Sequence, residues 1–104
     1  MTMKTPKQAI VRLEELGFVA EISEATGQIR GGTHREEARA IRVYMNSFTI
    51  TPNDDGSWHV GISSAASIDD EHLTVASLEE AVHAVHRGAI ERGWLKGGLI
   101  GQGQ

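Results

Sequence analysis

The side chains best suited to chemistry lie near the C-terminal end of the chain, in a segment with a helical pattern. Glu79, His83 and His86 are spaced at i, i+4 and i+7, which places them on one flank of a helix. Neutral imidazole and carboxylate are good ligands for zinc and other transition metals. A fourth ligand could come from His59 or His72 if a sheet packs under this flank. These residues are a candidate metal or ligand site.

Two simpler interpretations compete with a metal site. The spacing matches neither HExxH nor another tight zinc signature, and Glu79 and His83 form an ordinary i, i+4 pair on a helix rim. The two histidines with Ile90 could instead form a protein-contact surface whose strength varies between about pH 5 and pH 8. We therefore predict no metal and no cofactor, and keep Glu79, His83 and His86 as the alternative site.

Other patterns that bind ions are incomplete. Asp54-Asp55-Gly56 is a fragment of a calcium loop, but the rest of that motif is absent, so a hairpin turn is the better interpretation. Asp69-Asp70-Glu71 could be half of a magnesium site, although such a run is more often a solvated loop. Gly31-Gly32, which we expect to end a short strand, could cradle a phosphate. Neither a P-loop nor a GxGxxG motif supports this.

The chain lacks the signatures of a nucleophilic enzyme. It contains no cysteine and no GxSxG elbow. Ser63, Ser64 and Ser67 lie near His59 and Asp69 in the sequence, but proximity in sequence does not define a catalytic triad. We therefore predict that the protein is not an enzyme and has no catalytic residues.

The distribution of charge is the most informative feature of the composition. The net charge is −4, yet residues 43–86 contain no Lys or Arg and carry seven carboxylates, which leaves +3 on the rest of the chain. This block argues against contact with nucleic-acid phosphates. Solubility is the simplest reason for an acidic surface. The alternative is an acidic face for a basic partner, formed by Asp54, Asp55, Asp69, Asp70, Glu71, Glu79 and Glu80.

These carboxylates lead to a functional hypothesis, a small acidic module that binds a protein. Its acidic face would dock on a basic, nucleic-acid-binding protein where phosphates normally bind, as small inhibitors from phages and mobile elements do. Opposite charges would speed this association. We expect no direct contact with nucleic acid or membrane. The absence of cysteine, of a signal peptide and of a membrane-spanning run favours the cytoplasm.

A first helix is predicted over residues 6–16. Thr5 and Gln8 form a capping box, Pro6 suits the first helical position, and Gly17 suits the position just beyond the end. The apolar residues recur at helical spacing. They are Ala9, Ile10, Leu13 and Leu16.

A second helix is predicted over residues 78–92. Ser77 and Glu80 form a capping box, Glu79 and Glu80 suit the positive end of the helix dipole, and Gly93 ends the helix. Its buried stripe would be Leu78, Ala81, Val82, Val85 and Ala89.

Between these helices the sequence alternates with the period of two that indicates strands. The clearest hairpin spans residues 48–63, with a turn at residues 52–56. Shorter strands are predicted over residues 18–22, 28–30 and 72–76. The hairpin residues expected to face the core are Phe48, Ile50, Trp58, Val60 and Ile62.

Residues 34–44 fit two patterns. Thr33 and Glu36 form a capping box before good helix formers, and on this basis we predict a helix. However, Ile41 and Val43 also fit the alternation of a strand. Such a strand would run into the hairpin and form a three-stranded meander.

With that strand, the element order resembles the α-β-β-β-α arrangement of double-stranded-RNA-binding domains. Those domains bind phosphate through lysine at the start of their last helix. This chain has Glu79 and Glu80 there, so the resemblance ends at element order and implies no RNA binding.

The elements together predict an α+β fold, with a small antiparallel or mixed sheet around hairpin 48–63 and helices packed on one face. Residues 1–96 would form one domain and residues 97–104 a flexible Gly-rich tail. Trp94 and Leu95 would cap the core or, alternatively, form an apolar interface for a partner or a homodimer.

Overall fold

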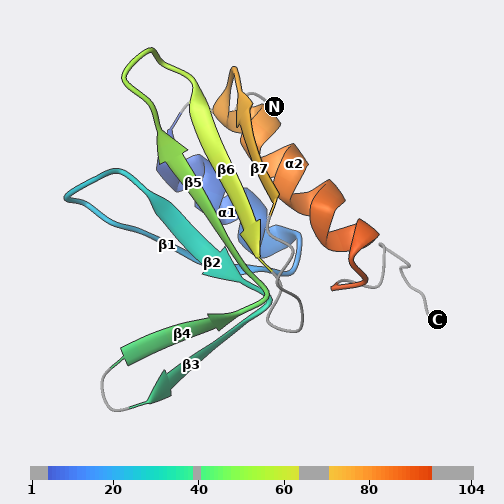
Figure 1. Ribbon diagram of the computed structural model, residues 1–104. Helices are drawn as coiled ribbons and strands as arrows, with labels where there is room; N and C mark the ends of the chain where they lie inside the picture. Colours follow the sequence, from blue (N-terminus) through green and yellow to red (C-terminus); the bar gives the residue numbers. More distant parts are fainter. Residues whose placement is uncertain (1–4, 39–40, 64–70, 95–104) are drawn as a thin grey trace.

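The computed structural model describes residues 5–38, 41–63 and 71–94 (Figure 1). Within these residues a helix comes first, seven strands follow, and a second helix ends the fold. The predicted tail at residues 97–104 lies outside the described residues. The elements are α1 Pro6–Glu15, β1 Val19–Ile22, β2 Ile29–Gly32, β3 His34–Ala38, β4 Ile41–Met45, β5 Ser47–Pro52, β6 Trp58–Ser63, β7 Glu71–Val75 and α2 Leu78–Glu91.

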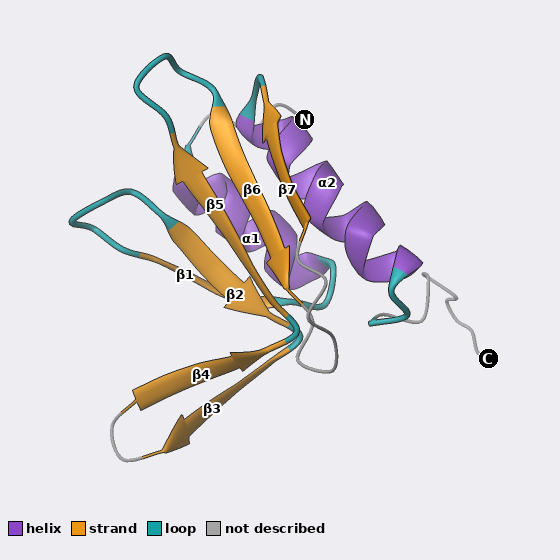
Figure 2. Cartoon of the chain, viewed as in Figure 1, coloured by secondary structure: helices purple, strands orange, loops and turns teal. Residues whose placement is uncertain are grey.

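Five strands form one antiparallel sheet in the order β1-β2-β5-β6-β7, and both helices lie against the same face of it (Figure 2). The predicted α+β fold with a small antiparallel sheet and helices on it is therefore confirmed. The predicted hairpin is the pair β5–β6, with Phe48 opposite Ile62 and Ile50 opposite Val60. It lies at the centre of the sheet, so the strongest alternation in the sequence marks the most enclosed strands.

The core lies between this sheet and the two helices. Phe48, Ile50, Val60 and Ile62 are buried, as their alternation predicts, and Trp58 is partly buried against them. Burial of each such side chain contributes about 1.5–3 kcal/mol. The helices supply the stripes that their spacing predicts. Their buried apolar residues are Ala9 and Leu13 in α1, and Leu78, Ala81, Val82, Ala84, Val85 and Ala89 in α2.

Local sequence signals determine where both helices begin and end. Thr5 and Gln8 form the predicted capping box at the start of α1. Gly17 and Gly93 follow α1 and α2 with φ values of 106° and 77°, a left-handed conformation that ends a helix at low cost for glycine. In the part of the chain that the structure describes, no helix has the length and apolar character to cross a membrane.

The prediction of a helix over residues 34–44 is wrong. This segment contains β3 and β4, which pair as a separate two-stranded antiparallel sheet with His34 opposite Met45 (Figure 1). The capping-box pattern is only a local signal. Ile41 and Val43 are β-branched residues that favour strands, and pairing with the facing strand outweighs the helix signal.

A bend separates this two-stranded sheet from the main one. It lies at Thr33 and Asn46, where Asn46 has a positive φ of 51° and its Nδ2 donates a hydrogen bond to Thr33 Oγ1 at 3.2 Å. The alternative prediction for residues 34–44, a strand that runs into the hairpin, is therefore closer to the structure. β4 and β5 follow one another, but the bend places them in different sheets, so the predicted meander of this strand with the β5–β6 hairpin does not form.

Gly31 and Gly32 were expected to end the short strand after β1, and this prediction is also wrong. Both are buried within β2. A Cβ atom built on Gly31 would lie 2.2 Å from the carbonyl oxygen of Val19 and 2.7 Å from Phe48 Cζ. Glycine is present because the neighbouring backbone and the Phe48 ring leave no space for a side chain.

Candidate functional site

Three turns lie at the same end of the main sheet because its strands alternate in direction: β1–β2, β5–β6 and β7–α2 (Figure 1). Each contributes exposed carboxylates. Four of these carboxylates are predicted partner-binding residues. The fifth, Glu24, was missed by sequence reasoning because it lies outside the acidic block of residues 43–86. We call Glu24, Asp54, Asp55, Glu79 and Glu80 the acidic end. Lys7, in the first turn of α1, lies at the same end, since α1 and β1 run in opposite directions.

The β5–β6 turn holds Asp55 in a defined position. Asp55 Oδ1 accepts hydrogen bonds from Ser57 Oγ at 2.6 Å and from Ser57 N at 3.0 Å. The bond from the Ser57 side chain, and then that from its backbone, lowers the pKa of Asp55 below its usual value. The neighbouring Asp54 is exposed. The turn therefore presents two carboxylates, one of them fixed by hydrogen bonds that favour its charged form.

The start of α2 presents the next pair of carboxylates. Ser77 is the N-cap, and its Oγ accepts a hydrogen bond from Glu80 N at 3.1 Å. The same hydroxyl donates to Glu80 Oε1 at 3.2 Å, which orients the Glu80 side chain. Glu79 and Glu80 are exposed in the first turn, where the helix dipole favours negative charge.

Of the remaining predicted partner-binding residues, Glu71 does not join the acidic end. Glu71 lies at the opposite end of β7, where its Oε1 accepts a hydrogen bond from Arg92 Nη2 at 3.0 Å. Asp69 and Asp70 lie outside the described residues. The acidic block of the sequence is therefore split between the two ends of the molecule.

Trp94, predicted either to cap the core or to form an apolar interface, is partly buried against the core. The Arg92 guanidinium lies 5.9 Å from the centroid of its ring. Trp94 N donates to the carbonyl oxygen of Ala89 at 2.9 Å, which folds the chain back on the last turn of α2. Leu95, its predicted companion, lies outside the described residues.

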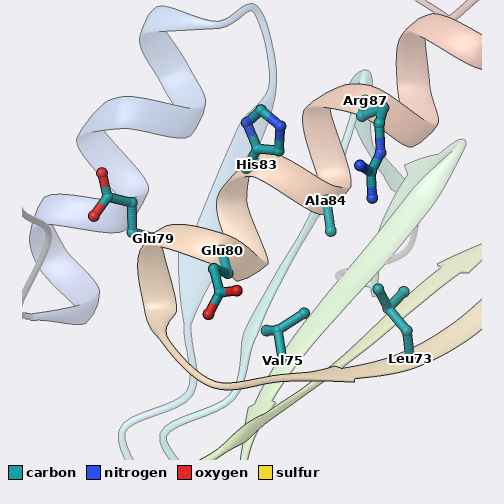
Figure 3. Close-up of a pocket in the computed structure, with 7 residues that line it drawn as sticks. All are labelled: Leu73, Val75, Glu79, Glu80, His83, Ala84 and Arg87. Atoms are coloured by element: carbon teal, nitrogen blue, oxygen red, sulfur yellow. The ribbon is translucent and has the colours of Figure 1, made fainter.

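A groove of about 310 Å³ lies between β7 and α2 and reaches the acidic end (Figure 3). β7 is the last strand of the main sheet, so its outer side pairs with no other described strand. Apolar side chains from both elements line the groove together with charged and polar side chains of α2. The lining residues are Leu73, Val75, Ala84, Glu79, Glu80, His83 and Arg87.

The structure does not gather the candidate metal ligands into one site. Glu79 and His83 line the groove, whereas His86 is not among its lining residues. Burial, followed by the charges of Arg12 and His83, lowers the pKa of His86. The described residues contain no group of three or more His, Cys, Asp or Glu side chains arranged to hold a metal ion.

A histidine pair that sequence reasoning missed lies on the opposite face of the sheet. His59 alternates with the core-facing residues of β6, so it points away from the helices. His59 Nε2 and His72 Nδ1 are 3.1 Å apart, and the two rings are stacked with their centroids 5.2 Å apart. The expectation that either could complete a site on the flank of α2 is therefore wrong. Only the register of β6 with β7, which pairs Gly61 with His72, brings them together.

Comparison with known proteins leaves the functional argument to geometry alone. No family model, no curated protein and no solved structure matches this chain.

Proposed function

We propose that the protein is a small binding module whose acidic end docks on a basic surface of a partner protein. The observation that supports this is the position of three turns at one end of the sheet. It gathers exposed carboxylates from separate parts of the chain, namely Glu24, Asp54, Asp55, Glu79 and Glu80. The partner surface would be of the kind that otherwise binds nucleic-acid phosphates, because the acidic end and a nucleic-acid backbone both present dense negative charge.

Two carboxylates of the acidic end are held in place before any partner binds. Asp55 is fixed by Ser57, and Glu80 is held by the N-cap Ser77. Binding therefore costs less side-chain entropy than it would for flexible carboxylates. A concentrated charge also steers a basic partner and raises the association rate, and this effect weakens with salt.

Charge reversal at the acidic end tests this proposal. Asp54→Lys with Glu79→Lys changes two exposed residues that make no hydrogen bond or ion pair with a described residue, so the fold should be retained. Immobilised protein should capture basic, nucleic-acid-handling proteins from a host lysate at about 0.15 M salt and release them at about 1 M. The double variant should bind each captured protein about tenfold more weakly, measured with the purified pair.

The matched control makes the same change of charge at the other end of the molecule. Glu14→Lys with Glu91→Lys alters exposed residues at the C-terminal ends of α1 and α2. This control should keep the affinity within about twofold. Equal weakening in both variants would mean that only net charge matters, and unchanged binding in the first variant would refute the proposal.

A further inference from the structure

We infer that the groove between β7 and α2 binds an extended segment of the partner, which adds to the sheet as an antiparallel strand along β7. This inference rests on the proposed function, because the basic residue of that segment is the one that meets Glu79 and Glu80. The inference goes beyond the proposed function because it assigns a backbone-pairing site to this protein and a sequence pattern to the bound segment.

The edge strand supplies the first argument. The outer side of β7 faces no described strand, so alternate N–H and C=O groups there can pair with an added strand. Its residues, Glu71–Val75, include neither the proline nor the lysine that commonly block such an edge. Leu73 and Val75 are only half-buried, so their apolar surface on the groove side remains to be covered.

The groove beside this edge supplies the second argument. An added strand directs every second side chain toward α2, and the volume of about 310 Å³ can receive these side chains. Leu73, Val75 and Ala84 make the middle of the groove apolar (Figure 3). The middle residue of the segment should therefore be apolar.

The charges along the groove give the segment a direction. Glu79 and Glu80 lie at one end and Arg87 at the other (Figure 3). From Glu80 to Arg87 the helix rises about 10 Å, which corresponds to three to four residues of a strand. An antiparallel addition to β7 runs in the same direction as α2, since α2 returns along β7. The segment therefore carries a basic residue, an apolar residue two positions later and an acidic residue four positions later.

A pair of short peptides tests this direction. The forward peptide is acetyl-Thr-Lys-Thr-Val-Thr-Glu-Thr-amide, and the reversed peptide exchanges its Lys and Glu. With a fluorescent label, fluorescence polarisation should show the forward peptide binding about tenfold more tightly than the reversed one. Arg87→Glu should remove most of this preference. The same change of charge on the open face of the sheet, Arg30→Glu, should leave it intact. Equal or undetectable binding of both peptides would overturn the inference.

Backbone methylation tests whether the segment adds as a strand. Two versions of the forward peptide carry N-methyl groups at odd or at even positions, so that one of them loses the hydrogen bonds directed at β7. That version should bind at least about tenfold more weakly. If both versions bind like the parent peptide, strand addition is excluded. If capture of the partner still depends on Asp54 and Glu79 in that case, the acidic end remains the docking site. Only the inference that the groove binds an added strand is then rejected.

Discussion

At the scale of single residues, Gly31 sets how closely β1 and the Phe48 ring approach β2. The Gly31→Ala variant should lower the free energy of unfolding by about 3 kcal/mol, because its Cβ would lie 2.2 Å from a backbone oxygen that cannot rotate away. Urea denaturation followed by circular dichroism measures this change. A loss below about 1 kcal/mol would show that β1 moves aside easily.

Gly61→Ala is the matched control for this variant. Gly61 is also a buried strand glycine, but its Cβ would first meet Thr49 Oγ1 at 3.0 Å and then His72 Nδ1 at 3.4 Å. Both atoms belong to side chains that can rotate. The expected cost is below about 1 kcal/mol, and equal costs for the two variants would contradict the backbone clash at Gly31.

At the scale of elements, the start of α2 depends on one hydroxyl group. Ser77→Ala removes the acceptor of the Glu80 N–H, and the free energy of unfolding should fall by about 1 kcal/mol. Ser77→Asn, which keeps a capping oxygen, should restore most of it. Urea midpoints of the three proteins give the comparison. If the Asn variant is as unstable as the Ala variant, the capping bond is not the cause.

At the scale of the whole molecule, we expect His86 to make the stability of the fold depend on pH. Its pKa is lowered from 6.5, chiefly by burial and then by the charges of Arg12 and His83. Below about pH 6.5 the unfolded chain binds this proton more readily than the folded protein does, so stability should fall as pH drops through this range and level off below the folded pKa.

The variant His86→Gln should reduce this loss of stability between pH 7.5 and pH 5, measured as the change in unfolding free energy. If the variant retains the loss in full, the lowered pKa of His86 is not responsible for it.

Short-range patterns in the sequence were enough to predict most of the elements. The alternation over residues 48–63 predicts a hairpin with Phe48 and Val60 inward, and the structure confirms it. Capping residues such as Thr5 and Ser77 mark the starts of both helices correctly. These signals succeed because a buried face repeats with the period of the backbone, and because a cap acts within one turn.

Tertiary structure decided what the sequence left open. The competing signals over residues 34–44 were resolved by pairing between β3 and β4. The acidic end gained Glu24 and lost Glu71 because strand direction determines which turns lie at the same end of the sheet. The groove between β7 and α2 and the pair of His59 with His72 both depend on strand order and register. These follow from contacts between residues distant in sequence, for which no local pattern exists.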